Sequence, residues 1–173
     1  MFKIEYRIVI SEFEDEISGM DGFIKFSENN HSYGDIYPKE IEQYMGVELI
    51  YYWFIYFMQA IIGLENKDYV LISDIESYNI LIQIERNRDV VYISVIRTDK
   101  PVGTTAVEFV SVPNIRYTDW KKQKTSYVQL KTEVKENTEK YYNEICKLNP
   151  LKHNHELIQK YLEYLNRLNQ LLI

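Results

Sequence analysis

The sequence has little cysteine and no uninterrupted hydrophobic segment at its N-terminus. Its 173 residues include one cysteine, Cys146, which excludes an internal disulfide and favours the reducing cytosol. Cys146 falls in a predicted helix with no histidine placed to activate it, so we expect an inert, partly buried thiol. Charges at Lys3, Glu5 and Arg7 interrupt the first hydrophobic segment. We therefore predict no secretory signal peptide and a cytoplasmic protein.

The common signatures of catalytic and cofactor sites are also missing. The sequence has no glycine-rich phosphate loop, no nucleophile elbow, no helix with paired histidines and no paired cysteines at zinc spacing. Active sites are assembled in space, so an enzyme is not excluded by this absence. It favours a protein that works by binding, and we predict no catalytic residue, no cofactor and no metal.

What the sequence does have is the composition of one globular domain. Hydrophobic residues make up 46% and charged residues 27% of the chain, and a chain of this length can bury a substantial core. It contains no internal repeat, low-complexity tract or linker, so residues 1–173 are predicted to form a single domain. The sixteen tyrosines we attribute in part to the base composition of an AT-rich genome.

The most hydrophobic stretch is residues 47–62, in which Glu48 and Gln59 are the only residues that do not count as hydrophobic. A membrane span needs about 20 apolar residues, and this run is shorter. We predict a helix over residues 39–63, with Pro38 at its first turn, that is buried in a soluble core on more than one side. A helix that faces a partner and a membrane helix are the alternatives.

Extended segments are predicted on both sides of this helix. The first alternates apolar and polar residues, as a half-buried strand does, and residues 27–35 have the composition of a turn. Residues 79–85 and 90–96 are joined so closely that they must pair antiparallel. The predicted strands are residues 2–11, 23–26, 69–76, 79–85, 90–96 and 107–113.

The C-terminal part has helical periodicity. One helix is predicted to begin at Thr118 or Asp119, to end before a break at residues 149–154, and to be followed by a second helix that folds back on it. The order of elements indicates an α+β fold. We predict an antiparallel sheet of about five or six strands, a central buried helix and a C-terminal antiparallel helix pair, through which a homo-oligomer is conceivable.

The net charge of −6 is unevenly distributed. Residues 1–50 contain four Lys/Arg and eleven Asp/Glu, a net charge of −7, whereas residues 101–173 contain eleven and eight, a net charge of +3. An acidic surface repels nucleic acid and attracts cationic proteins. The predicted partner is therefore a basic protein, with a merely solvated acidic turn as the alternative. The predicted partner-binding residues are Glu12, Glu14, Asp15, Glu16, Asp21, Glu28 and Asp35.

Two histidine-containing segments are candidate sites of other kinds. His31, Tyr33 and Asp35 combine a base with a carboxylate that would orient it, although the same residue types are common in surface turns. His153 and His155 match a metal-binding pair only if the segment is extended. No third ligand lies near them in sequence, so a helix boundary is the preferred interpretation.

The layout of residues 23–96 resembles a known class of bacterial proteins. It consists of "GDIYPKEIEQY", an aromatic helix around "YYWFIYF" and the strands of "YVLISDIESYNILIQIERNRDVVYISVI". This order is similar to that of small cytosolic immunity proteins encoded beside secreted polymorphic toxins. The resemblance implies inhibition of a toxin domain by direct binding, without cofactor or catalysis. Many such toxins are nucleases with basic faces, which would suit the acidic first half.

We therefore expect a non-enzymatic immunity protein that neutralises a cationic toxin domain. Two alternatives stay open. One is a small enzyme or ligand-binding domain with a cleft lined by tyrosines, which a closed cavity containing His31 and Asp35 would favour. The other is a structural protein that assembles through its C-terminal helices.

Overall fold

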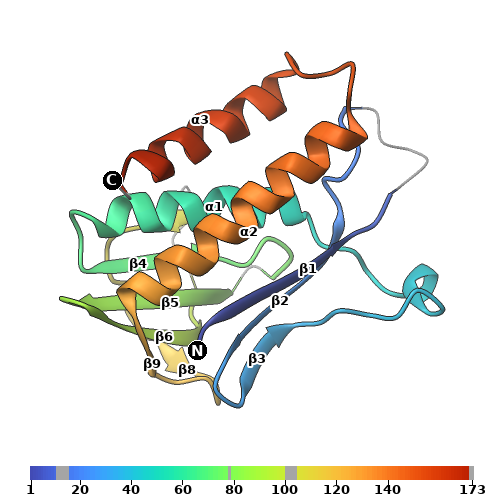
Figure 1. Ribbon diagram of the computed structural model, residues 1–173. Helices are drawn as coiled ribbons and strands as arrows, with labels where there is room; N and C mark the ends of the chain where they lie inside the picture. The colour runs from blue at the N-terminus through green and yellow to red at the C-terminus, as the bar shows by residue number, and fades with distance from the viewer. Residues whose placement is uncertain (11–15, 78, 100–104, 172–173) are drawn as a thin grey trace.

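The computed structural model describes residues 1–10, 16–77, 79–99 and 105–171, which form two antiparallel sheets and three α-helices (Figure 1). The α+β architecture expected from the sequence is confirmed. In chain order the elements are β1 (Lys3–Ile8), β2 (Gly22–Glu28), β3 (His31–Gly34), the 3₁₀ turn η1 (Glu42–Tyr44), α1 (Ile50–Leu64), β4 (Tyr69–Ser73), β5 (Ile80–Asn87), β6 (Val90–Arg97), β7 (Val107–Glu108), β8 (Arg116–Tyr117), β9 (Gln123–Ser126), α2 (Tyr127–Leu148) and α3 (Glu156–Gln170).

The two sheets divide the strands by their position in the chain. The smaller sheet has the order β1-β2-β3, and the six-stranded sheet has the order β7-β4-β5-β6-β8, with β9 also paired to β6. The hairpin β5–β6 pairs Ile80 with Arg97 at one end and Asn87 with Val90 at the other. The antiparallel pairing predicted from the short connection between these strands is therefore confirmed.

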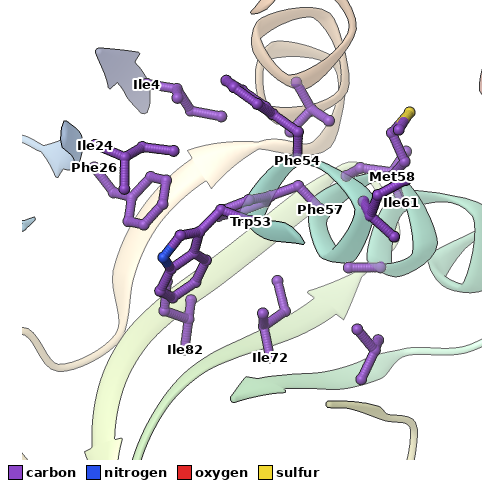
Figure 2. Packing of buried hydrophobic residues seen from close by; sticks show 14 of the residues in the cluster. Ile4, Ile24, Phe26, Trp53, Phe54, Phe57, Met58, Ile61, Ile72 and Ile82 are labelled. Carbon is purple, nitrogen blue, oxygen red and sulfur yellow. The ribbon is translucent and has the colours of Figure 1, made fainter. Parts of the chain in front are cut away.

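Helix α1 occupies the centre of the molecule. In Figure 1 it runs between the six-stranded sheet and the antiparallel pair α2 and α3, and the smaller sheet lies beside it. Figure 2 shows Trp53 of α1 with Phe26 of β2 on one side and Ile82 of β5 on the other. No residue of α1 is exposed, so the predicted burial on more than one side is confirmed.

Tyrosine hydroxyls connect these layers. The four buried tyrosines of the described residues each donate a hydrogen bond to a backbone carbonyl that is distant in the chain. Tyr51 of α1 reaches Leu157 O at 2.9 Å, and burial raises the pKa of Tyr161 well above its ordinary value. A buried hydroxyl needs such a partner, so these tyrosines have a structural role whatever the genome composition. The remaining pairs are Tyr127 with Ile61 O, Tyr141 with Gly19 O and Tyr161 with Thr138 O.

The predicted start of the central helix at residue 39 is wrong, because α1 begins at Ile50. Glu48 exchanges two backbone hydrogen bonds with Gly22, of 2.7 and 2.9 Å, which commits the backbone groups that a helix would use. The N–H of Tyr51 then donates to Met20 O at 3.1 Å and compensates for the missing side-chain cap. The predicted end near Gly63 is correct to one residue.

The strand predicted over residues 107–113 is only β7, Val107–Glu108. Two further boundaries differ from the predictions. The helix predicted from Thr118 or Asp119 begins at Tyr127, because residues 116–117 and 123–126 pair with β6 as β8 and β9. Ser126 caps the helix by accepting from Gln129 N at 3.0 Å. The turn predicted at residues 27–35 contains β3, which pairs with β2. In both places the backbone partner lies in another strand, and side-chain periodicity does not reveal it.

The described residues contain no helix with both the length and the hydrophobicity that a bilayer span requires. Cys146 is a free, half-buried thiol on α2, as expected. The break predicted at residues 149–154 and the antiparallel packing of the last two helices are confirmed.

Candidate functional site

The acidic residues predicted to bind a partner fall in separate parts of the molecule. Glu12, Glu14 and Asp15 lie outside the described residues. Glu16 is exposed and directly precedes a firmly held segment, since Ile17 is 1% exposed. The next residue, Ser18, exchanges two hydrogen bonds of 2.8 Å with Asn149, so this segment is fixed beside the turn between α2 and α3. Glu16 therefore has a defined place on the surface.

The other three predicted residues differ in exposure. Asp35 is exposed after β3, and the Tyr37 hydroxyl lies 3.4 Å from its carboxylate. Asp21 is half-buried. Glu28 is 1% exposed and accepts from the N-terminal ammonium group of Met1 at 2.6 Å. Because its charge is covered, we do not retain Glu28 in the surface considered below.

The structure gathers a group of carboxylates that the sequence did not single out. Glu48, Asp74 and Glu76, here termed the acidic cluster, are close enough to interact electrostatically. Asp74 accepts from the Tyr33 hydroxyl and from the N–H groups of Glu76 and Ser77. Asp35 follows Tyr33 by two residues, so the acidic cluster extends the negative charge at this end of β3.

The neighbouring carboxylates affect the pKa of Glu48. Burial raises the pKa of the Glu48 carboxyl, the negative charges of Asp74 and Glu76 raise it further, and the hydrogen bond from Trp53 Nε1 at 2.9 Å opposes the shift. A carboxyl whose pKa is raised on folding binds its proton more tightly in the folded state. Its contribution to stability is therefore greatest at low pH and is lost as the pH rises through the raised pKa.

We expect Glu48→Gln to increase the free energy of unfolding at pH 7 by about 0.5–1 kcal/mol, the size of one partly solvated charge interaction. The amide removes the charge and keeps an acceptor for the Trp53 indole. The gain should shrink as the pH is lowered to 4, where Glu48 is protonated. Urea unfolding at pH 7 and at pH 4 measures the change in the free energy of unfolding. Glu40→Gln is the control, because Glu40 is exposed. A Glu48→Gln protein less stable than wild type at pH 7 would contradict this account.

The second candidate site is a cavity of about 360 Å³ between the two sheets. One wall comes from the β2–β3 hairpin and the other from β5, β6 and the segment after β8. The side chains with chemical interest among its lining residues are His31, Tyr33, Arg97, Thr118, Asp119 and Trp120. His31 and Tyr33 thus meet at one cavity as the sequence suggested, but Asp35 does not line it, and Asp119 is the carboxylate there.

The hydroxyl groups of Tyr33 and Thr118 at this cavity have partners within the chain. The Tyr33 hydroxyl donates a hydrogen bond to Asp74. Burial and the nearby Asp74 carboxylate raise the pKa of Tyr33. Thr118 Oγ1 donates to Val95 O at 2.9 Å and accepts from Trp120 N at 3.2 Å. Within the described ranges, no hydrogen bond joins a hydroxyl or thiol to His31, which an activated nucleophile would need.

Comparisons with protein-family models, with curated proteins and with solved structures find no match for this chain. The function proposed below therefore depends on the chain's own residues.

Of the two histidines near α3, His155 has a structural role. The N–H of Leu157 donates to His155 Nδ1 at 3.3 Å, so His155 is the N-cap of α3, in line with the preferred interpretation of a helix boundary. In the part of the chain that the structure describes, no three His, Cys, Asp or Glu side chains are grouped as a metal site.

The sequence analysis did not identify Asp74, Glu76 and Trp120 as site residues, because it assigned their segments to other structures. Asp74 and Glu76 fell inside the strand predicted over residues 69–76, whereas β4 ends at Ser73, and Trp120 lies in the segment predicted to be helical. Asp74 instead accepts from the N–H groups of Glu76 and Ser77, as an Asx turn does. Nothing local indicated that Tyr33 would be its partner.

Proposed function

We propose that this protein is a cytoplasmic, non-enzymatic binding protein of the immunity type. Its own acidic side chains would contact a cationic toxin domain directly and so neutralise it. The observation that carries the proposal is the charge asymmetry of the chain, with a net charge of −7 over residues 1–50. Electrostatic complementarity of this kind accelerates association with a basic partner and disfavours acidic ones.

The exposure of individual carboxylates supports this proposal. Glu16 and Asp35 are exposed, and neither carboxylate forms an ion pair among the described residues, so their charge is available to a partner. The Lys152 ammonium group donates to the backbone carbonyl of Glu16 and not to its side chain. By contrast, Glu42 forms an ion pair with Arg7. We place the contacts with the partner at the exposed carboxylates, which are the acidic run that ends in Glu16 and, separately, Asp35.

The functional test is neutralisation in cells. The reading frame adjacent to the gene is expressed in a bacterial host with and without this protein. We expect the adjacent product to arrest growth alone and co-expression to restore growth. Arrest that co-expression does not relieve, or an adjacent product without toxicity, would count against the immunity assignment.

The electrostatic part has its own prediction. Changing Glu14, Asp15 and Glu16 together to lysine should lower the association rate constant for the neutralised toxin domain by roughly tenfold or more at low salt. The difference should shrink as added salt screens the charges. Surface plasmon resonance at several salt concentrations gives the rate constants.

The matched control reverses three charges elsewhere on the surface. Asp89, Glu136 and Glu163 are exposed in the β5–β6 turn and on α2 and α3. Their change to lysine alters the net charge equally, so the association rate should fall much less. Equal losses in the two triple variants would show that net charge alone, and not a defined surface, governs binding.

Assembly through the C-terminal helices stays a prediction. The apolar stripe on which it was based packs inside the chain, since Ile158, Tyr161 and Leu168 are fully buried. Tyr161 contacts the aromatic rings of Tyr141 and Tyr142 on α2.

A further inference from the structure

The segment between β3 and α1 leaves hydrophobic side chains in solvent. Ile41, Tyr44 and Val47, here termed the apolar knob, are 42%, 77% and 38% exposed. They are three of nine exposed large hydrophobic side chains among the described residues. The exposure is therefore concentrated in one short segment, unlike the single surface residues that need no explanation. Figure 1 shows this segment, in cyan, projecting away from the helices and sheets.

The backbone of this segment is held in place although its side chains are exposed. The Arg7 guanidinium group pairs with the Glu42 carboxylate and also donates to the carbonyl oxygen of Tyr37, so it joins the two sides of the turn. At the far end, the backbone pairing of Glu48 with Gly22 fixes the chain before α1. A contact element that is already fixed loses less conformational freedom on binding than a mobile loop does, which favours affinity.

The 3₁₀ turn η1 places two of the hydrophobic side chains on one side. The N–H of Tyr44 donates to Ile41 O at 3.0 Å. A 3₁₀ helix has three residues per turn, so side chains three residues apart lie above one another. Ile41 and Tyr44 therefore share one side of the turn, and Val47 follows it. Since the core of the chain does not bury these side chains, they are available to another molecule.

Negative charge adjoins the apolar knob on both sides in the chain. Asp35 and Glu40 are exposed, and neither forms an ion pair among the described residues. Lys39 is the only cation of residues 35–47. Glu48 follows the knob and interacts with the other carboxylates of the acidic cluster. An apolar centre with a charged rim is the usual anatomy of a protein interface, and tyrosine is a frequent anchor there.

We propose that the apolar knob inserts Tyr44 into a hydrophobic pocket of the cationic toxin domain, with lysine or arginine side chains at the rim of the pocket facing Asp35 and Glu40. This inference rests on the proposed function and adds the contact that holds the complex together. Charge attraction mainly sets the association rate, whereas a buried aromatic anchor mainly sets the dissociation rate. Binding kinetics therefore separate the two contributions.

The test compares wild type and Tyr44→Ala in binding to the domain encoded by the adjacent reading frame, by surface plasmon resonance. We expect Tyr44→Ala to raise the dissociation rate constant by about thirtyfold or more, as the loss of an aromatic anchor does, with little change in the association rate constant. The increase should persist at high salt, unlike the effect of the charge-reversed triple variant. Val128→Ala shortens an exposed side chain on α2 and should leave both rate constants unchanged.

The outcomes separate this inference from the proposed function. Failure of the wild-type protein to bind the domain would overturn both. Binding that Tyr44→Ala weakens no more than Val128→Ala does would overturn the knob as anchor and leave the charged contacts standing. Light scattering of the protein alone tests a different occupant, because a dimer that Tyr44→Ala dissociates would assign the knob to a second copy of the chain and refute the proposal. Circular dichroism should show that Tyr44→Ala is folded, in line with its exposure.

Discussion

Replacing Phe57 by alanine is expected to lower the free energy of unfolding by about 3–5 kcal/mol. Phe57 is fully buried in the middle of α1, and its ring contacts Phe2, Phe26 and Trp53 with centroid separations of 6.2, 4.9 and 6.2 Å. The ring therefore joins α1 to β2 and to the residue that precedes β1. Its removal leaves a cavity that three rigid aromatic neighbours cannot fill, and domains of this kind have only about 5–15 kcal/mol in total.

Urea unfolding followed by circular dichroism measures this loss. The control is Tyr44→Ala, because Tyr44 is 77% exposed although the sequence placed it in the same helix. Its change should alter stability by less than about 0.5 kcal/mol. A Phe57→Ala protein within about 1 kcal/mol of wild type would show that the packing around α1 differs from that in Figure 2.

Gly22→Ala is expected to lower stability by about 3 kcal/mol, or to prevent folding, through overpacking. A Cβ at this position would lie 2.3 Å from the carbonyl oxygen of Arg7 and 2.9 Å from Ile50 Cδ1. The carbonyl belongs to the β1–β2 pairing, and Gly22 also holds Glu48 through two backbone hydrogen bonds. The backbone cannot move away without breaking one of these contacts.

Gly46→Ala is the matched control for this prediction. No atom lies within 4 Å of a Cβ added at Gly46, so the change should leave stability unaltered or raise it slightly through reduced freedom of the unfolded chain. Thermal unfolding of the two alanine variants compares them directly. Similar melting temperatures would mean that Gly22 is not the close contact between β1, β2 and the start of α1.

The candidate sites were predictable only in part. The excess of carboxylates in the first fifty residues, and the polar group of His31 and Tyr33, were evident from the sequence. The burial of Glu28 was not predicted, because its charge favoured a surface position, although Glu28 follows Ile24 and Phe26 on the buried face of β2. Asp119 replaces Asp35 at the cavity because the segment after β8 folds back onto β6.

The sequence by itself determined the classes and order of the main elements. Hydrophobic periodicity is a local property, and it was sufficient for β1, for the β5–β6 hairpin, for the burial of α1 and for the C-terminal helix pair. Tertiary structure alone decided where α1 and α2 begin and which carboxylates and ring systems meet. Glu48 leaves the helix because its backbone pairs with Gly22, and residues 116–117 and 123–126 become strands because β6 lies beside them. Such hydrogen bonds join residues distant in the chain, and no side-chain pattern near either partner encodes them.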